Sequence, residues 1–376
     1  MLSFWEKNSF LKYDVIIIGS GILGLSTACE IKENHPDKSI LILERGIFPT
    51  GASTKNAGFA CFGSLTEILA DFKTKGEQNT LELISKRIKG IEALRKRLGD
   101  ERIGYINNGG YELIDKDNLD KLNFRGGVNL MLKDIVGEDV FEIRDDLISQ
   151  FGFNANRVKS LVYSKYESQI DTGLMMSNLI LYAQEKGIRI INGSEVKDFH
   201  IKSNKVEVAV SHNVLKEDVV FECEKLVLCC NAFTDKLFKD IKVTPGRGQV
   251  LATKPIKNLK FKGVFHYDEG FYYFRDYNNR VIFGGGRNRD FKKEASHEFD
   301  YNFEILDDLR EKLEHVILPS EEFEIDYYWT GIMGFTETKE PEIRDIENKV
   351  IGAISCNGMG IALSSYLAKE ITSKYF

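Results

Sequence analysis

The stretch Tyr13-Asp14-Val15-Ile16-Ile17-Ile18-Gly19-Ser20-Gly21-Ile22-Leu23-Gly24 is the most informative part of this chain. Its first half is an apolar run typical of a buried strand, and its second half is a glycine pattern that opens a helix. Gly19 permits the tight turn, Gly21 lets the backbone approach a phosphate, and Gly24 lets the helix pack against the strand. The helix N-terminus adds unpaired N–H groups and a partial positive charge. Together they predict a binding socket for the pyrophosphate of a dinucleotide.

A second apolar run, residues 39–43, supports this interpretation. It ends at Glu44, which lies 20 residues after Gly24. An acidic residue at the end of the second strand is expected to meet a ribose hydroxyl. Between the two strands, Ile22 to Glu30 fits a helix, and Asn34-His35-Pro36-Asp37 ends it. A strand, turn and helix could also occur without a ligand. The order and spacing of the strand, the three glycines, the helix and the acidic residue nevertheless favour a nucleotide-binding site.

Length and charge limit the classes of protein to consider. With 376 residues the chain is long enough for two domains. Its formal net charge is -6 and it has no basic block, so we expect no nucleic-acid partner. No apolar run approaches the ~18–20 residues that span a bilayer. The first twelve residues lack the pattern of a secretory signal, so a cytoplasmic location is expected.

The six cysteines do not form a recognisable motif. No two of them have C-x-x-C spacing, and no histidine lies close enough in the sequence to complete a zinc site. Cys229 and Cys230 follow an apolar run and are expected to be buried as small apolar residues. We therefore expect neither a metal site nor a disulfide framework.

Two parts of the chain differ in their pattern. We expect an amphipathic packing helix at 80–98. In the nucleotide-binding part we expect helices at 172–185 and 361–374, strands at 187–191, 225–230 and 350–356, and a hairpin of 205–210 with 219–223. The charged face of the helix at 80–98, which includes Arg87, is expected to be solvated. Between 243 and 329 short aromatic-rich strands (249–253, 271–275 and 280–283) and one helix near 300–315 predict an antiparallel lobe.

The predicted fold class is therefore α/β (α+β), with a Rossmann-like nucleotide-binding domain and an antiparallel-sheet substrate domain. We expect the nucleotide-binding domain to be discontinuous, because its pattern resumes twice after excursions. The predicted division assigns 1–80, 155–240 and 331–376 to that domain, and 81–154 and 241–330 to the substrate-binding domain.

Four segments together resemble the FAD-dependent D-amino acid oxidase superfamily, which includes glycine oxidase, sarcosine oxidase and D-amino acid dehydrogenase. The segments are 15–24 with Glu44-Arg45, 51–58, Pro245-Gly246-Arg247-Gly248-Gln249, and Cys356-Asn357-Gly358-Met359-Gly360. Many nicotinamide enzymes share the first segment, whereas the combination is specific to this flavin family. The resemblance covers essentially the whole chain and implies FAD as the cofactor.

The resemblance also implies which residues hold the FAD. They are Gly19, Gly21, Ile22, Leu23 and Gly24 at the pyrophosphate, Glu44 and Arg45 at the adenosine ribose, Val196 at the adenine, Ser53, Asn56, Ala57 and Gly58 beside the ribityl chain and flavin, and Asn231, Ala232, Gly331, Gly358, Met359, Gly360 and Ile361 in the closing strands and C-terminal loop. A helix that begins at Gly360 or Ile361 would direct its positive end toward the flavin.

The implied reaction is hydride transfer from a carbon that bears an amine to flavin N5, followed by hydrolysis of the imine. The substrate is a small molecule, and the final electron acceptor is O₂ or a quinone. Such chemistry belongs to the cofactor, while protein groups orient the substrate and tune the flavin ring.

One expected substrate residue is missing. In the amino-acid oxidases an arginine that pairs with the substrate carboxylate lies shortly after a late strand, and Met333 takes its place here. Arginine offers a planar fork to a carboxylate, whereas methionine offers a soft apolar group. The sarcosine oxidases bond the flavin through a cysteine near this position. Met333 cannot form that bond, so noncovalent FAD is implied.

Several residues could take the role of the missing arginine. Tyr272 and Tyr273 lie on the strand that lends an active-site tyrosine in this family, and Arg287 follows Gly284-Gly285-Gly286. These three and Met333 are our candidates for the substrate pocket. Further candidates are Arg247, in what we interpret as a glycine turn, His266, and the run Tyr327-Tyr328-Trp329. Each of them could instead serve in packing or in local hydrogen bonding.

Three other functions remain open at this point. The same fold could oxidise a 2-hydroxy acid or another alcohol, since Met333 removes one argument for amino acids. A tRNA-modifying flavoenzyme exists within the wider superfamily, but the acidic net charge argues against that function. A nicotinamide dehydrogenase is disfavoured, because the C-terminal glycine loop would have no role in it.

Overall fold

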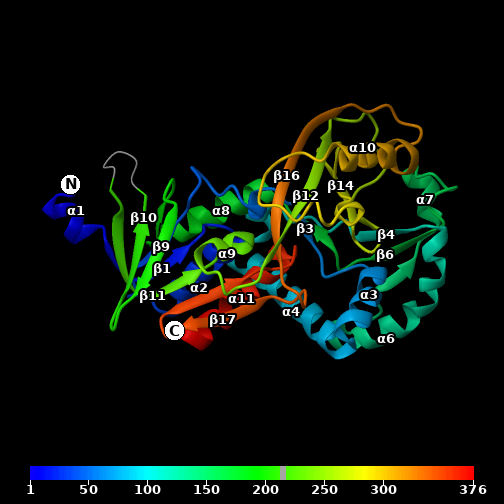
Figure 1. Cartoon of the computed structure of the whole chain (residues 1–376). Helices are drawn as coiled ribbons and strands as arrows, with labels where there is room; N and C mark the ends of the chain where they lie inside the picture. The colour runs from blue at the N-terminus through cyan, green and yellow to red at the C-terminus, as the bar shows by residue number, and fades with distance from the viewer. Residues whose placement is uncertain (212–216) are drawn as a thin grey trace.

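The computed structural model describes residues 1–211 and 217–376 (Figure 1). Two large sheets organise these residues. Figure 1 shows the first sheet on the left, with both chain termini, and the second on the right. The shorter elements around them are α1 (Phe4–Ser9), β3 (Phe59–Ala60), α5 (Asp100–Ile103), α7 (Asp146–Phe151), β7 (Ser168–Gln169) and α9 (Thr234–Leu237).

The first sheet has the strand order β17-β18-β11-β1-β2-β8, and β10 and β9 extend it from β11. The strands are β1 (Lys12–Ile18), β2 (Ile40–Leu43), β8 (Arg189–Ile191), β9 (Val196–Ile201), β10 (Val206–Val210), β11 (Val219–Leu228), β17 (Glu342–Glu347) and β18 (Val350–Ile354). The run from β18 through β11, β1 and β2 to β8 is parallel. This arrangement confirms the Rossmann-like nucleotide-binding fold.

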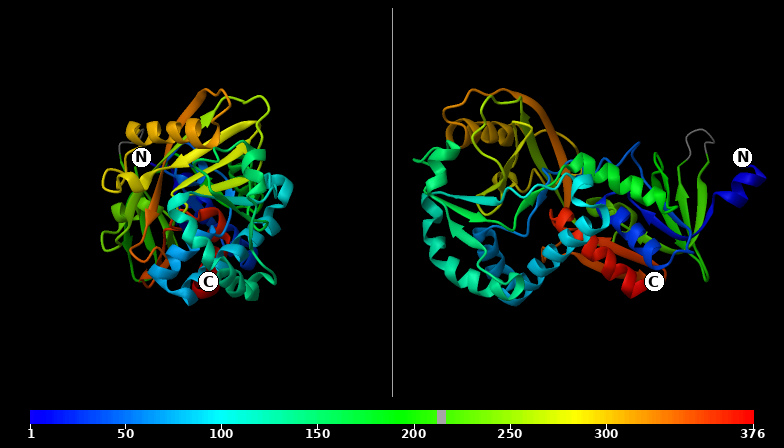
Figure 2. Two further views of the ribbon diagram at one scale, coloured as in Figure 1. Left: turned by 90° about the vertical axis from the view of Figure 1, so that its right-hand side faces the viewer. Right: turned by 180° about the vertical axis from the view of Figure 1, so that it is seen from behind.

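Four helices pack together beside the first sheet: α2 (Ile22–Asn34), α4 (Glu77–Leu98), α8 (Thr172–Glu185) and α11 (Gly360–Tyr375). Figure 2, in its right view, shows α11 in red beside α2 in blue. The contact of α4 with α11 is close, because a Cβ on Gly90 would collide with the backbone carbonyl oxygen of Ala362. Apolar residues of β1 and β2 alternate between this helical core and a second core that β9 to β11 cover.

The second sheet has the order β16-β12-β15-β14-β13-β4-β6-β5. Its strands are β4 (Gly110–Ile114), β5 (Phe141–Ile143), β6 (Ser160–Ser164), β12 (Thr244–Thr253), β13 (Val264–Tyr267), β14 (Tyr272–Tyr277), β15 (Arg280–Gly285) and β16 (Ile325–Phe335). An aromatic core, in which Phe265 stacks on Phe274 with ring centroids 4.6 Å apart, packs beneath α10 (Phe303–Lys312). On the other side lie α3 (Leu65–Lys75) and α6 (Arg125–Val136).

The strands β12 to β16 pair antiparallel with one another, as predicted for residues 243–329, and the second sheet as a whole is mixed because of one parallel pair with β4. β4 pairs with β13 in parallel, while its other partner β6 is antiparallel. β4 comes from a part of the chain about 150 residues before β13, so no local pattern announces this pairing. The division into domains stays a prediction, and its boundaries do not follow the sheets: β6 lies after residue 155 but belongs to the second sheet, and β16 crosses the boundary at residues 330–331.

Three local predictions also need correction. The first helix continues beyond Glu30 to Asn34. The expected strand at 225–230 is the second half of β11, which runs without interruption from Val219 to Leu228. The segment around Arg247 is not a turn, since it lies within β12 and pairs with β16. None of the helices in residues 1–211 and 217–376 is long and apolar enough to cross a membrane. The expected cytoplasmic location stays a prediction.

Candidate active site

A cavity of about 490 Å³ runs between the first sheet and the second, a size typical of small-molecule sites. The residues that we assigned to FAD from the sequence lie on its wall, except for Gly24, Gly58 and Ala232. The predicted pocket residues Tyr273, Arg287 and Met333 line it as well, and Tyr272 does not.

The glycine turn at one end of the cavity has the packing that its sequence predicts. Gly19 has a φ of +102°, and a Cβ there would lie 2.7 Å from the carbonyl oxygen of Cys229. A Cβ on Gly24 would collide with the carbonyl oxygen of Gly19, so only glycine lets α2 approach β1 this closely. The first turn of α2 therefore directs its unpaired N–H groups toward the cavity.

Ser53 has a role in this turn that the sequence did not suggest. Its Oγ accepts a hydrogen bond of 2.9 Å from the backbone N–H of Ile22, the first residue of α2. Ser53 thus supplies the side-chain cap that Gly21 lacks, and it ties the loop at 51–58 to the helix N-terminus. A Cβ on Gly21 would lie only 3.0 Å from this Oγ.

Glu44 lies at the end of β2 and is buried on the cavity wall. Its Oε2 accepts hydrogen bonds from the N–H of Ser20 (3.0 Å) and from the Ser20 hydroxyl (2.8 Å), and its Oε1 accepts one from the N–H of Gly46 (2.9 Å). A carboxylate has about four acceptor sites. One of them is left for a ligand hydroxyl, as the predicted ribose contact requires. Arg45 stacks on the ring of Phe233, 3.8 Å from its centroid.

The loop beside the expected flavin position is held from both sides. The Asn56 amide donates to the carbonyl of Ser53 (2.8 Å), and its Oδ1 accepts from Gly58 (2.9 Å) and from the Thr172 hydroxyl (2.8 Å). From the second sheet, the buried Arg275 donates to the carbonyls of Ala57, Gly58 and Ile170. The Asn56 side chain therefore shapes the loop and is not free for a ligand, and Gly58 takes part in the loop through its backbone.

The opposite wall comes from β16 and the C-terminal segment. Asn231, with a φ of +52°, accepts a hydrogen bond from the N–H of Gly334 through its Oδ1 (2.9 Å). This bond fixes the end of β16, where Met333 lies. α11 begins at Gly360, and its first residues line the cavity. A second helix N-terminus thus faces the cavity, as the resemblance implied.

The two candidate tyrosines lie on opposite faces of β14, because successive strand residues alternate. Tyr273 lines the cavity, and burial raises the pKa of its hydroxyl to about 12 although the nearby Arg287 acts in the opposite direction. Tyr272 is buried on the other face and donates to Asp308 at 2.7 Å. Tyr272 is therefore a packing residue of the α10 side and not a pocket residue.

Arg287 is the candidate whose guanidinium lies on the cavity wall against aromatic rings. Its guanidinium lies 4.0 Å from the ring centroid of Phe335 and 4.9 Å from that of Phe291. Among the residues that the structure describes, no carboxylate forms an ion pair with it. Burial lowers its pKa, and Tyr273 and Glu294 partly offset that effect.

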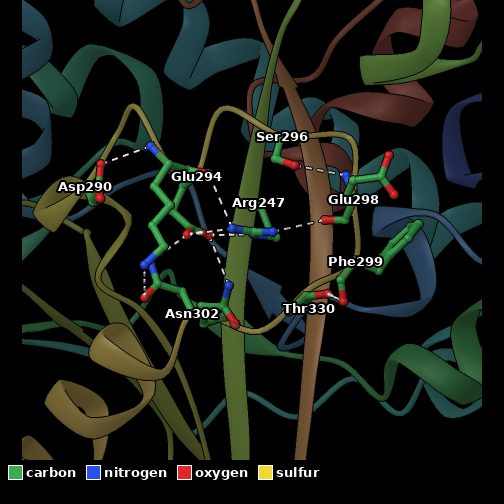
Figure 3. A network of polar contacts seen from close by, with 10 residues as sticks. Arg247, Asp290, Glu294, Ser296, Glu298, Phe299, Asn302 and Thr330 are labelled. Carbon is green, nitrogen blue, oxygen red and sulfur yellow. Dashed lines mark hydrogen bonds and ion pairs between the residues drawn. The ribbon is translucent and has the colours of Figure 1, made fainter.

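Arg247 is excluded as a substrate residue by its partners (Figure 3). It forms a bidentate ion pair with Glu294, with Nε to Oε2 at 2.9 Å and Nη2 to Oε1 at 3.0 Å. Gln249 and Asn302 donate to the same carboxylate at 3.0 and 2.8 Å. Both ions are buried, and Arg247 does not line the cavity. The pair fixes the loop after β15 onto β12.

The aromatic run at 327–329 lies outside the cavity, whereas His266 lies on its wall. Trp329 uses its Nε1 to donate to the carbonyl of Lys55 at 2.9 Å and does not line the cavity. Tyr327 and Tyr328 are exposed. His266 does line the cavity, and its Nε2 lies 2.8 Å from Oε2 of the buried Glu167. Of these residues only His266 can therefore contact a bound substrate.

Sequence reasoning missed several cavity residues, of which Arg87 is the most significant. We expected it on a solvated face of the helix at 80–98, but it is 5% exposed and lines the cavity. The error had a detectable signal. Arg87 lies three residues after Ile84 and four before Ile91, which places it on the apolar stripe of α4. Cys61, which follows the flavin loop, was also missed.

Comparison with known proteins identifies the class to which this site belongs. Residues 14–374 match the DAO family of FAD-dependent oxidoreductases, so the chain belongs to this family and is an FAD-dependent oxidoreductase. A probable oxidoreductase OrdL from Haemophilus influenzae is 25% identical over 388 aligned positions, which cover 95% of this chain and 81% of the relative. A D-amino acid dehydrogenase from Helicobacter pylori is 25% identical over 67% of this chain and 68% of its own.

Solved structures share the fold. L-proline dehydrogenase from P. horikoshii superposes with a TM-score of 0.77 at 16% identity, covering 96% of this chain and 93% of that one. Glycine oxidase from Geobacillus kaustophilus superposes with a TM-score of 0.76 at 18% identity, covering 97% and 94%. These likenesses support the architecture of two sheets described above.

The residues present fit FAD. The two helix N-termini that face the cavity suit the pyrophosphate and the electron-rich edge of a flavin. Gly21 lies on the cavity wall, and the absence of a side chain there leaves Ser53 in place at the helix N-terminus that would meet the pyrophosphate. The open acceptor site of Glu44 suits a ribose hydroxyl. When bound, FAD supplies the acceptor for two electrons and a proton as hydride.

Proposed function

We propose that this flavoenzyme oxidises the amine-bearing carbon of an amino acid, and that Arg287 binds the substrate carboxylate. The observation that carries the proposal is a half-buried guanidinium on the cavity wall without a carboxylate partner among the described residues. A buried cation is costly unless an anion pairs with it. A carboxylate that enters the cavity would provide that anion in a bidentate contact.

The neighbours of Arg287 support this orientation of the substrate. The rings of Phe335 and Phe291 lie in cation–π contact with the guanidinium, and such contact leaves its N–H groups available to donate to a carboxylate. Tyr273 and Met333 line the same part of the cavity. With its pKa raised to about 12, the Tyr273 hydroxyl keeps its proton at neutral pH and can donate it in a hydrogen bond. The arginine of this site therefore comes from the segment that follows β15, and the position at which relatives place theirs is occupied by Met333.

The test is anaerobic bleaching of the FAD absorbance by D- and L-amino acids, with Arg287→Met and Arg287→Lys as variants. We expect at least one amino acid to bleach the wild type, and Arg287→Met to raise its half-saturating concentration by about 100-fold, which corresponds to ~2.7 kcal/mol. Lysine should recover part of the affinity, since it keeps the charge but loses the fork. The proposal fails if Arg287→Met binds the substrate as the wild type does.

A 2-hydroxy acid carries the same carboxylate, so Arg287 alone does not separate the two classes. The similarity to a D-amino acid dehydrogenase favours the amine. Bleaching by hydroxy acids but not by amino acids would decide for the alcohol.

We also propose that FAD is bound noncovalently. Met333 has a thioether and no ionisable thiol at the position where relatives form a flavin bond, and burial raises the pKa of Cys356 to about 11, so its thiol stays protonated. Acid precipitation should release all of the FAD into the supernatant. A yellow pellet would contradict this. Rates of reoxidation with O₂ and with a soluble quinone would identify the acceptor.

A further inference from the structure

A second cation faces the cavity, far along the chain from Arg287. Arg87 of α4 is 5% exposed. Its Nη1 donates to the carbonyl of Phe62 at 2.7 Å, while its buried Nε has no hydrogen-bond partner. Within the described residues, no carboxylate lies in ion-pair distance of this guanidinium. An N–H donor left in this state costs free energy unless a ligand satisfies it.

His266 of β13 lies near the same place, because one of its ring nitrogens lies within 4.8 Å of the Cys61 thiol, and Arg87 acts electrostatically on that thiol. Its ring is fixed by the hydrogen bond from Nε2 to Glu167 and by an edge contact with Phe59, whose ring centroid is 5.3 Å away. Nδ1 has no partner among the described residues and is the nitrogen that remains for a ligand. Burial lowers the pKa of His266, but Glu167 and two further glutamates raise it to about 9, so the imidazole is a cation at neutral pH.

The other charged groups at this place have partners of their own. Lys75 pairs with Asp71 at 2.8 Å, and Lys121 pairs with Glu269. Burial raises the pKa of Glu112, whose carboxylate accepts hydrogen bonds from Ser64 and Thr66. Three glutamates act on His266, of which Glu167 is bonded to its ring and keeps a buried Oε1 without a hydrogen-bond partner. Glu67, which accepts from the N–H of Ser64 at 3.4 Å, is the one of these three that lines the cavity and would oppose an anion there. The thiol of Cys61 is buried, and burial raises its pKa well above the usual value.

The register of the second sheet relates this place to Arg287. His266 lies opposite Tyr273, and Tyr273 lies opposite Gly284, three residues before Arg287. Neighbouring strands are ~4.8 Å apart, so the backbones of His266 and Gly284 lie about 10 Å apart across the sheet, and Arg287 follows three residues beyond Gly284. A ligand that contacts both Arg287 and His266 must therefore bridge two strand spacings, which favours an extended chain with a polar group at each end.

We propose that Arg87 and His266 form a second carboxylate-binding point, and that the substrate is an amino acid whose side chain carries its own carboxylate. This deepens the proposed function and rests on it. Arg287 holds the carboxylate next to the reacting carbon. The Arg87 Nε–H and the His266 Nδ1–H hold the distal carboxylate. The acceptor that Arg87 lacks in the free protein is thus provided by the substrate.

The test uses unreactive ligands and the FAD-loaded protein, with the shift of the flavin spectrum as the measure of binding. Butyrate probes the Arg287 end alone, and glutarate probes both ends. We expect glutarate to bind about tenfold more tightly than butyrate, which is ~1.4 kcal/mol. Arg87→Gln and His266→Gln should each reduce this preference, with butyrate affinity unchanged. Arg95→Gln is the matched control on α4, since Arg95 pairs with Asp100 on the surface and should change neither affinity.

The outcomes separate the two proposals. If neither acid binds to the FAD-loaded protein, the proposed function fails. If butyrate binds through Arg287 but glutarate has no advantage, the second binding point is wrong and the proposed function stands. Equal affinity for glutaramate, which carries an amide at the distal end, would overturn the need for a charge.

A further variant keeps the test decisive if Arg87→Gln loses its FAD. Glu67→Gln removes the opposing carboxylate and should tighten glutarate binding severalfold, with butyrate unchanged. An unchanged glutarate affinity in Glu67→Gln would overturn the proposal.

Discussion

Replacing Arg247 by methionine should destabilise the protein without weakening ligand binding. The guanidinium forms two hydrogen bonds with the Glu294 carboxylate, at 2.9 and 3.0 Å, and Glu294 is 0% exposed. Arg247→Met leaves this carboxylate buried with only the amides of Gln249 and Asn302. Breaking a buried pair by removing one partner costs ~3–5 kcal/mol. With an unfolding entropy of about 2.1 cal/mol/K per residue, Tm should fall by ~4–6 °C.

The assay is thermal unfolding of wild type, Arg247→Met, Glu294→Met and the double variant, all at saturating FAD, because bound ligand shifts Tm. The loss of stability in the double variant should be smaller than the sum of the losses in the two single variants, with a coupling energy of ~1–3 kcal/mol. Burial raises the pKa of Glu294, but Arg247, Asn302 and Gln249 lower it below its ordinary value. The difference in Tm between the wild type and Arg247→Met should therefore become smaller as the pH falls and Glu294 becomes protonated. A Tm drop below ~1 °C, or lost ligand binding at unchanged Tm, would refute this reasoning.

Further predictions concern the cofactor socket, the helix contact and the buried histidine. Gly21→Val should abolish FAD retention, measured as bound flavin per chain, because its branched side chain would displace Ser53 from the helix N-terminus and crowd the backbone that the pyrophosphate approaches; retained flavin would place the pyrophosphate elsewhere. Gly90→Ala should cost ~1–3 kcal/mol in urea unfolding, because the clash with Ala362 outweighs the ~1 kcal/mol gain in helix propensity; a stabilised variant would show that the helices can separate freely. The pKa of His266 is about 9 in the folded protein, against an ordinary value of 6.5. The protonated imidazole therefore stabilises the folded state fully below pH 6.5, and this stabilisation is lost as the pH rises through 9. The Tm difference between wild type and Glu167→Gln should therefore be largest near pH 6.5 and narrow toward pH 9, whereas a constant difference would contradict an ionised pair.

The nucleotide-binding part could be predicted because its signals are local. The strand and glycine turn at residues 13–24 are contiguous, and the predicted helix at 172–185 has the same bounds as α8. For Tyr272 and Tyr273 the sequence predicts only that adjacent strand residues face opposite sides. Which of the two faces the cavity depends on the placement of α10, and this is tertiary information.

The substrate end could not be predicted, because its residues come together only in the fold. Glu167 and His266 are 99 positions apart, and the parallel pairing of β4 with β13 that brings their surroundings together has no sequence signal. Arg247 has the opposite problem. Its glycine neighbours suggested a turn, but the long ladder with β16 kept it in a strand.

The parallel pairing of β18 with β11 and the packing of α11 on α2 have a consequence for synthesis of the protein. A ribosome has completed the glycine turn at residue 24 long before it adds Val350. The helix that covers α2, and the C-terminal loop that closes the cavity, do not yet exist at that stage. Native contacts of such high sequence separation slow folding. The FAD socket therefore matures only after β18 and α11 have left the ribosome.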